Sequence, residues 1–191
     1  MPESPPAARD GLPRWRLVAA ITVAVLAVVG VIVAAGYVKS RPATSVDDPL
    51  SLSSVQSPGA TTPACTSLMA ALPDSLAGLP RRVIEHADDP SLAGVAAWGE
   101  PAVVLRCGVP TPAELTCTAA LQEVDGVAWL PLSTGGDTTY FLVDRSVRVA
   151  LTVPAAVTST GPWQQASTII GATLPERAIC RDGVPLLGDG E

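Results

Sequence analysis

An uncharged apolar run near the N-terminus constrains this chain of 191 residues more than any other feature. From Leu17 to Val38 the sequence contains no Asp, Glu, Lys or Arg. A helix rises about 1.5 Å per residue, so these 22 residues would span roughly 33 Å, which is enough to cross the hydrocarbon core of a bilayer. We therefore predict a single transmembrane helix at Leu17–Val38, with membrane lipid as its partner.

The same run also fits a cleaved signal peptide, with small residues at Ala34-Ala35-Gly36 near the cleavage site. Secretory apolar regions usually extend over only about 7–15 residues, and this one is longer, so an uncleaved anchor is favoured. Basic residues flank the run on both sides: Arg9, Arg14 and Arg16 before it, Lys39 and Arg41 after it. This small excess on the N-terminal side favours a single-pass protein of the cell membrane with a cytoplasmic N-terminus.

The rest of the chain divides by composition. Residues 1–16 are predicted to form a short cytoplasmic tail. In Lys39–Pro63, 13 of the 25 residues are Ser, Thr or Pro, and such a segment buries too little apolar surface to offset its ordering entropy. It is predicted to be a linker to an extracytoplasmic domain at 64–187, and residues 188–191 are predicted to be a disordered end.

Residues 64–187 alternate apolar segments with turn signals, which predicts an α+β domain. One helix is expected from Pro63 to Pro73 and a second one between Pro162 and Pro175. Asp125-Gly126 lies between two apolar runs and predicts a two-residue hairpin turn. Strands are expected at 102–109, 121–124, 127–132, 138–143 and 147–153, with 82–85 as a candidate edge strand. The predicted fold is a small, mostly antiparallel sheet with both helices on one face, stapled by disulfides.

Four cysteines lie in this predicted domain and none lies before it. An even count beyond a membrane anchor favours two disulfides and an oxidising compartment. Of the three pairings we favour Cys107 with Cys117, across the turn at Gly108-Val109-Pro110, and Cys65 with Cys180, which would tie the two helices together. A zinc site is the alternative, but the sequence contains no closely spaced Cys pair and no C-x-x-C redox motif. Neither a metal nor a cofactor is predicted.

The charged residues argue against one class of function and leave another open. A formal net charge of −6 argues against binding to nucleic acid, which requires a basic surface. His86 is the only histidine and precedes Asp88-Asp89-Pro90, a sequence typical of a turn, so a solvated loop histidine is favoured over a catalytic one. The alternative function is a hydrolase that uses His86 or a carboxylate pair from among Asp88, Asp89, Glu100, Glu114 and Glu123.

Four residues are candidates for binding a partner: Arg81, Arg82, Trp98 and Arg106. The arginines would contact an anion, because they concentrate positive charge in an otherwise acidic domain. The alternative for Arg106, which lies inside a predicted strand, is a pair with a carboxylate of the same chain. Trp98 lies beside Gly99 and Pro101, where it would form a rigid exposed platform. A core position is favoured for this Trp, however, because the sequence offers only one Phe to fill a core.

Short motifs in this domain resemble a known family. They are Leu-Pro and Leu-Ala-Gly-Leu-Pro after Cys65, Arg81-Arg82, Trp98-Gly99-x-Pro101, Leu105-Arg106-Cys107-Gly108-Val109 and Gly126-Val127-x-Trp129. Together they are similar to the actinobacterial domain-of-unknown-function family 3515 over residues 64–180, and the N-terminal membrane helix is similar too. The resemblance implies a small anchored envelope protein and carries over no catalytic residues. The chain departs from the family pattern at 140–143 before Asp144-Arg145, where a smaller Gly-Arg turn is expected.

The function predicted from the sequence is that of a membrane-anchored, extracytoplasmic module of the bacterial cell envelope. We expect it to bind another envelope component, either a protein or a cell-wall saccharide, without catalysis. No nucleic acid is expected among its partners.

Overall fold

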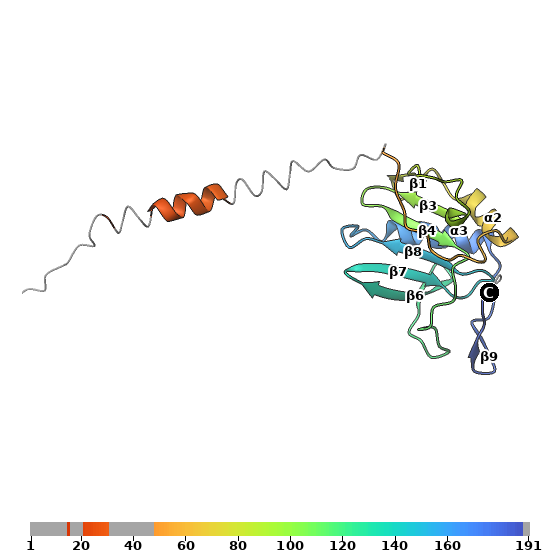
Figure 1. The fold of residues 1–191 in the computed structure, drawn as a ribbon. Helices are drawn as coiled ribbons and strands as arrows, with labels where there is room; N and C mark the ends of the chain where they lie inside the picture. The colour runs from red at the N-terminus through yellow and green to blue at the C-terminus, as the bar shows by residue number, and fades with distance from the viewer. Residues whose placement is uncertain (1–14, 16–20, 31–47, 189–191) are drawn as a thin grey trace, which may run out of the picture. The chain divides into compact units, whose positions relative to one another are not determined.

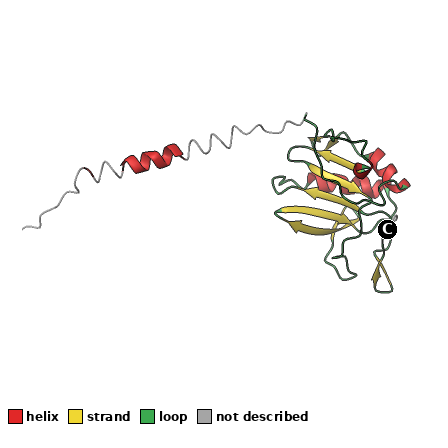
Figure 2. Cartoon of the chain, viewed as in Figure 1, coloured by secondary structure: helices red, strands yellow, loops and turns green. Residues whose placement is uncertain are grey.

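The computed structural model of the chain describes residues 15, 21–30 and 48–188. The chain divides into two units, residues 1–43 and 44–191, and each is considered by itself. In the first unit, residues 21–30 form an α-helix (Figures 1 and 2). These residues are exposed. Among the described residues, no helix combines the length and the apolar character needed to cross a membrane. The rest of the predicted span Leu17–Val38 lies outside the described residues, as does most of the predicted tail.

The second unit is built on a six-stranded antiparallel sheet with the strand order β3-β4-β8-β7-β6-β5 (Figure 1). Its strands are β3 (Val95–Trp98), β4 (Val103–Cys107), β5 (Gln122–Val124), β6 (Val127–Thr134), β7 (Asp137–Leu142) and β8 (Val149–Val153). The turn between β5 and β6 is formed by Asp125 and Gly126, which both have positive φ, at 50° and 70°. Positive φ at both central residues is what a tight hairpin turn requires, so the predicted hairpin is confirmed.

Two helices pack on one face of this sheet and enclose the main core. They are α2 (Pro63–Ala71) and α3 (Gly161–Thr173). Cys65 and Leu68 of α2 and Ala166 and Ile170 of α3 are buried together with inward-facing residues of the strands, such as Leu105. Thr62 caps α2, because its Oγ1 accepts a hydrogen bond from the backbone N of the third residue of the helix at 3.4 Å. The α+β fold and the positions of both helices are confirmed.

The opposite face carries a smaller core under an irregular segment. Leu115 from the loop after β4 is buried with Leu130 of β6 and with Val143, which follows β7. Three short elements complete the fold: the hairpin of β1 (Ser75–Leu76) and β2 (Leu79–Pro80), the 3-10 helix η1 (Pro90–Leu92), and the hairpin of β9 (Cys180–Arg181) and β10 (Val184–Pro185). The candidate edge strand at 82–85 is absent from the described structure, where this segment contributes only an isolated bridge at Ile84.

The segment 48–60, called the strap below, packs along the domain although the sequence predicts a linker there. Leu50 pairs in parallel with Ile84, and its N–H donates to the carbonyl of Val83 at 2.8 Å. At the other end of the strap, Gly59 N–H donates to the carbonyl of Gly108 at 3.0 Å. Backbone hydrogen bonds of this kind cannot be predicted from amino-acid composition. The domain therefore begins before residue 64, where the sequence places the boundary between linker and domain. Residues 39–47 of the predicted linker lie outside the described residues.

Glycine is required at position 108 because the strap comes so close to it. A Cβ at this position would lie 2.1 Å from the backbone N of Ala60, and the φ of Gly108 is +80°. A non-glycine side chain would therefore clash with backbone atoms and also be forced into a left-handed conformation. The contact fixes the point where the strap meets the end of β4.

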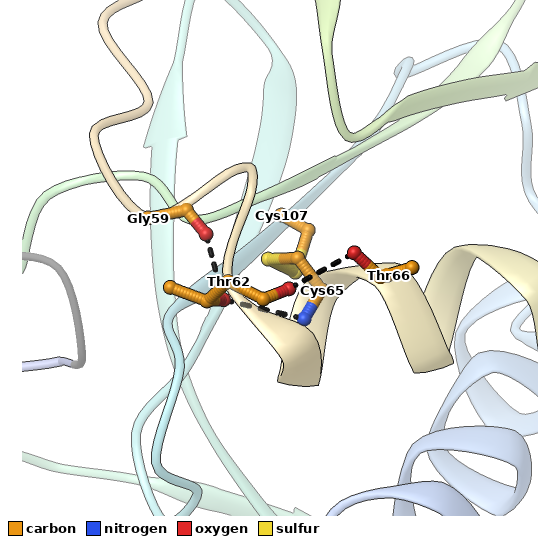
Figure 3. The surroundings of a disulfide bond; sticks show 5 residues. All are labelled: Gly59, Thr62, Cys65, Thr66 and Cys107. Carbon is orange, nitrogen blue, oxygen red and sulfur yellow. Dashed lines mark hydrogen bonds between the residues drawn. A yellow bond between two sulfur atoms is a disulfide. The ribbon is translucent and has the colours of Figure 1, made fainter.

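All four cysteines form disulfides, as predicted, but the predicted pairing is wrong. The structure joins Cys65 to Cys107, with Cα atoms 5.6 Å apart, and Cys117 to Cys180, with Cα atoms 5.9 Å apart. The first bond links the start of α2 to the end of β4 (Figure 3). Cys107 belongs to the helix-covered core, whereas the chain then crosses to the other face, where Leu115 is buried. The short sequence distance between Cys107 and Cys117 therefore does not place them together.

Candidate functional site

Trp98 belongs to the core and offers no platform to a partner. Its side chain is fully buried, and its Nε1 donates a hydrogen bond to the carbonyl of Pro73 at 3.0 Å. The guanidinium carbon of Arg81 lies 5.4 Å from the centroid of the Trp98 ring, within range of a cation–π interaction. Arg81 also donates to the carbonyl of Leu72 at 3.4 Å. The favoured core position of Trp98 is confirmed, and the exposed platform is wrong.

Arg82 and Arg106 hold the strap and do not form an open anion site. The buried guanidinium of Arg82 contacts Glu100 at 2.5 Å and donates to the carbonyl of Asp48 at 2.8 Å. Arg106 donates to the carbonyl of Ser53 at 3.0 Å, and burial lowers the pKa of its guanidinium. Both side chains therefore donate hydrogen bonds to backbone carbonyls of the strap. The sequence identified the right charges but could not show that their partners lie in the same chain.

His86 lies in an exposed turn, as the sequence predicts. Its side chain is 76% exposed, its φ is 55°, and its Nδ1 lies 3.8 Å from a carboxylate oxygen of Glu85. Asp89 is engaged in the same turn, because its Oδ1 accepts a hydrogen bond from the backbone N of Ser91 at 2.8 Å, which lowers the pKa of Asp89. Neither residue lines the cavity described next.

A cavity of about 380 Å³ opens at the edge of the sheet where β5, β6 and the segment before β9 meet. Its lining residues come from the β5–β6 hairpin, from the turn after β7 and from the segment that leads to β9: Glu123, Gly126, Ala128, Asp144, Glu176, Arg177, Ala178 and Ile179. Two of them, Ala128 and Ile179, also pack against the smaller core. The cavity therefore adjoins the face of the sheet that the helices leave uncovered.

Asp144 is the buried polar residue of this cavity. Its side chain is 10% exposed, and its Oδ2 accepts a hydrogen bond from Ala128 N at 2.8 Å and forms an ion pair with Arg145 Nη1 at 2.7 Å. Its Oδ1 is buried and has no hydrogen-bond partner among the residues that the structure describes. Burial raises the pKa of Asp144, and this effect exceeds the opposite effects of the Ala128 N–H and the Arg145 guanidinium.

Buried arginines hold the turn that carries Asp144. Arg148 is 1% exposed, and its Nη1 donates to the carbonyls of Val143 and Arg145, both at 3.0 Å. Arg145 in turn donates from Nη2 to the carbonyl of Gly126 at 3.0 Å. The carbonyl groups of the two residues that flank Asp144 are therefore held by Arg148, and the β5–β6 hairpin is tied to the same turn. This arrangement presents Asp144 in a rigid frame.

The sequence identified only part of this site. It points to Glu123 as one of the carboxylates that could form a catalytic pair, and it does not point to Asp144, Glu176 or Arg177. In the sequence, Asp144-Arg145 follows the segment 140–143 that departs from the family pattern, and it places two charges directly after an apolar strand. That signal marks the turn, but only the fold brings it together with the segment that precedes Cys180.

The lining favours a ligand that donates hydrogen bonds. Three carboxylates line the cavity with one guanidinium, from Arg177, and a second guanidinium, from Arg145, lies behind Asp144. Within the described ranges, no group of three His, Cys, Asp or Glu residues is arranged to hold a metal ion. The arrangement can accept hydrogen bonds from a polar or cationic ligand and can neutralise its charge.

Comparison with known proteins gives one match. A family model described as "Protein of unknown function (DUF3515)" matches residues 21–179 of the chain. No curated protein and no solved structure matches it.

Proposed function

The chain belongs to the DUF3515 family of proteins of unknown function, and we propose that it is a membrane-anchored binding protein of the bacterial cell envelope. The observation that carries the proposal is the cavity beside Asp144, where a nine-tenths buried carboxylate lacks a partner for one of its oxygens. A buried polar atom without a partner costs stability, and proteins retain such costs chiefly at functional sites. We propose that the cavity takes up an envelope component without transforming it.

Two features support a position outside the cytoplasm. All four cysteines are joined in disulfides, which persist in oxidising compartments and are rare in the cytosol. The uncharged run Leu17–Val38 has the length of a membrane anchor, and the flanking arginines favour a cytoplasmic N-terminus. On this proposal the cavity faces the space between the membrane and the cell wall.

The size of the cavity narrows the kind of ligand. A volume of about 380 Å³ lies in the range of small-molecule sites. We propose that the ligand is a small polar molecule or one polar group of a larger cell-wall component, since a flat protein surface would not fill such a recess.

Carbonate extraction tests the anchor, and added protease tests the orientation. Membranes washed with carbonate should retain the full-length protein, and protease added to spheroplasts should digest the disulfide-bonded domain while a cytoplasmic marker protein survives. A soluble product that begins near residue 37 would contradict the anchor. Protection of the domain in intact spheroplasts would contradict the orientation.

A hydrolase with a carboxylate pair is a second candidate, favoured by one observation. Glu123 and Asp144 line the same cavity, and burial raises the pKa of Asp144. Two carboxylates whose pKa values differ can serve as general acid and general base in glycoside hydrolysis. The test is release of soluble sugar fragments from purified cell wall by the wild-type protein and by Asp144→Asn. Release that the variant loses would favour the hydrolase, and no release by the folded wild-type protein would reject it.

A further inference from the structure

We propose that Cys117–Cys180, called the outer disulfide below, exchanges with a protein dithiol and that its redox state controls how firmly one wall of the cavity is held. The inference goes beyond the proposed binding function, because it concerns the chemistry of one bond. It can be tested without any ligand in the cavity.

The two disulfides differ in their access to a reactant. Cys65 and Cys107 are fully buried under the helices, whereas Cys117 is exposed and Cys180 is half-buried. Exchange requires a thiolate to reach one of the two sulfur atoms, so burial protects the first bond and not the second. Exposed disulfides are also the class to which labile and regulatory bonds belong.

One end of the outer disulfide lies in an irregular loop. Residues 108–121 connect β4 to β5, and within this loop the N–H groups of Leu115 and Ala119 donate to the carbonyls of Pro112 and Thr116, at 3.0 and 3.1 Å. These hydrogen bonds stay within the loop and do not attach it to a neighbouring segment. The bond at Cys117 provides a covalent attachment.

The other end lies in the hairpin of β9 and β10, which projects from the body of the domain (Figure 1). Each of its strands contributes two paired residues, and a hairpin this short is marginally stable by itself. The packing of Ile179 and a hydrogen bond from Arg148 to the carbonyl of Leu186 also hold it. The disulfide adds the covalent tie between this hairpin and the loop 108–121.

Opening the outer disulfide would release one wall of the cavity on one side. Residues 176–179 line the cavity and lead directly into Cys180. On its other side this wall is joined to the sheet, because Arg177 N–H donates to the carbonyl of Asp144 at 2.8 Å and Glu176 forms a bridge with Arg145. Reduction removes the tie at Cys180 and leaves these contacts in place. The wall should therefore become more mobile while the domain stays folded.

The surroundings of the bond favour a protein as the reactant. On the hairpin, Val184 is 64% exposed and Leu187 is 59% exposed. Exposed apolar side chains beside the bond offer the kind of contact on which protein interfaces are centred. A small thiol would gain nothing from them, so we assign the reaction to a protein dithiol of the C-x-x-C class.

The exchange balances without a further reactant. One thiolate of the dithiol attacks Cys117 Sγ, and the electron pair of the S–S bond passes to Cys180 Sγ, which takes up a proton. The second thiolate of the partner then attacks the partner's sulfur in the mixed disulfide, and Cys117 leaves and takes up the other proton. Two electrons and two protons pass to the domain, and the partner becomes a disulfide. The reverse reaction restores the outer disulfide.

Reduction of the full chain in detergent tests the selectivity of the exchange. Dithiothreitol serves as the small dithiol and reduced thioredoxin as the protein dithiol, and mass spectrometry after alkylation identifies the free thiols. We expect both reagents to open Cys117–Cys180 at least about a hundredfold faster than Cys65–Cys107.

Hydrogen exchange of the same samples tests the control of the wall. After reduction, the N–H groups of Arg177 and Leu186 should exchange at least about tenfold faster, because their acceptors lie on either side of the released segment. The N–H of Cys107, which donates to the carbonyl of Gly94 at 2.8 Å, should exchange at its original rate.

Serine variants separate the bond from other effects of the reagent. The double variant Cys117→Ser with Cys180→Ser should show the fast exchange of the wall without any dithiol, and added dithiol should change nothing further. Thr118→Ser is the matched control, because it alters an exposed neighbour of Cys117 and keeps the disulfide. It should exchange as the wild type does. Reduction of the wild-type protein keeps the inference testable if the double variant does not fold.

Three outcomes would overturn the inference. If both disulfides open at the same rate, the outer disulfide is not a selective site. If dithiothreitol opens it and thioredoxin does not, a protein dithiol is not the reactant. If it opens and the exchange of Arg177 and Leu186 is unchanged, its redox state does not control the wall. Each of these results would leave the proposed binding function standing, since none of them measures a ligand.

Discussion

The two faces of the six-stranded sheet are covered in different ways. The face under α2 and α3 is closed by apolar side chains, and both cysteines of its disulfide, Cys65 and Cys107, are fully buried. The other face is covered by irregular segments, its apolar cluster is smaller, and Cys117 of its disulfide is exposed. The cavity adjoins this second face.

The difference separates the part of the domain that supplies most of the apolar core from the part that adjoins the candidate site. Helices satisfy their own backbone hydrogen bonds and bring an almost continuous apolar surface to the sheet. Irregular segments bring carbonyl groups that need donors, which is why buried arginines such as Arg82 and Arg148 lie where they do. Polar groups that are held in place but only partly satisfied are what a binding site needs, and the second face provides one at Asp144.

Removal of an aromatic side chain from each face should give the largest difference. Trp98→Ala should lower the free energy of unfolding by about 3–5 kcal/mol, because Trp98 is fully buried in the helix-covered core. Phe141→Ala should cost less, because Phe141 is only partly buried over the smaller core. Chemical denaturation of both variants measures the difference. Equal losses would show that the two faces contribute alike.

The disulfides should differ in their access to reductant. Cys117 is exposed, so a mild reductant in native buffer should open Cys117–Cys180 first, while Cys65–Cys107 should require unfolding of the helix-covered core. Loss of Cys117–Cys180 should lower the free energy of unfolding by about 2–4 kcal/mol. Mass spectrometry after alkylation of free thiols identifies the order. Simultaneous reduction of both bonds would break the distinction between the faces.

Detachment of the strap should have a smaller effect. Arg82→Ala removes the bond to the carbonyl of Asp48 and leaves Glu100 without its ion pair, which should cost about 1–3 kcal/mol. Arg106→Ala removes the single bond to Ser53 and should cost about 1 kcal/mol. Limited proteolysis should cut residues 48–57 faster in both variants than in wild type. An unchanged rate of cutting would mean that backbone pairing at Leu50 holds the strap without the arginines.

The smallest expected effect is the pH dependence contributed by Asp144. Burial raises its pKa in the folded protein, so the folded state holds this proton more tightly than the unfolded state does. The resulting stabilisation is complete below the unfolded pKa of about 3.9 and is lost as pH rises through the raised folded pKa. The side chain in Asp144→Asn cannot ionise, so the variant does not lose this stabilisation. Its free energy of unfolding should therefore rise relative to that of the wild type as the pH increases.

Denaturant unfolding at a series of pH values measures how the difference in the free energy of unfolding between Asp144→Asn and wild type changes with pH. Glu114→Gln is the control for loss of an exposed carboxylate. Glu123, Glu176, Arg145 and Arg177 are the charged groups that surround Asp144, and they remain unchanged in both variants. A difference between Asp144→Asn and wild type that does not change with pH would show that Asp144 has an ordinary pKa.

The sequence predicts the features of this domain that depend on neighbouring residues. The turn at Asp125-Gly126, both helices and five of the six strands of the large sheet follow from local patterns. β3 was missed, because Val95–Trp98 is a short segment buried at every position and shows no alternation. Oxidation of all four cysteines follows from their even number in a domain predicted to lie outside the cytoplasm.

Features that depend on which segments meet in space could not be predicted. The pairing of the cysteines depends on the crossing from one face to the other between Cys107 and Cys117. The roles of Arg82 and Arg106 depend on a strap whose composition resembles a linker. The cavity brings Asp144 together with Glu176 and Arg177 across an isolated bridge between Arg145 and Glu176, which no periodicity in the sequence indicates.

The connectivity of the disulfides has a consequence for the order in which the chain matures. Cys65–Cys107 and Cys117–Cys180 close two rings that follow one another along the chain and do not overlap. Because the chain is synthesised from its N-terminus, Cys65 and Cys107 can form their disulfide before residue 117 has been added. The alternative pairing of Cys65 with Cys180 would require nearly the whole domain to be synthesised first. Neither ring contains a cysteine of the other ring. For Cys65 and for Cys117, the native partner is therefore the next cysteine along the chain. Oxidation in order of synthesis thus yields the native bonds without reshuffling by an isomerase.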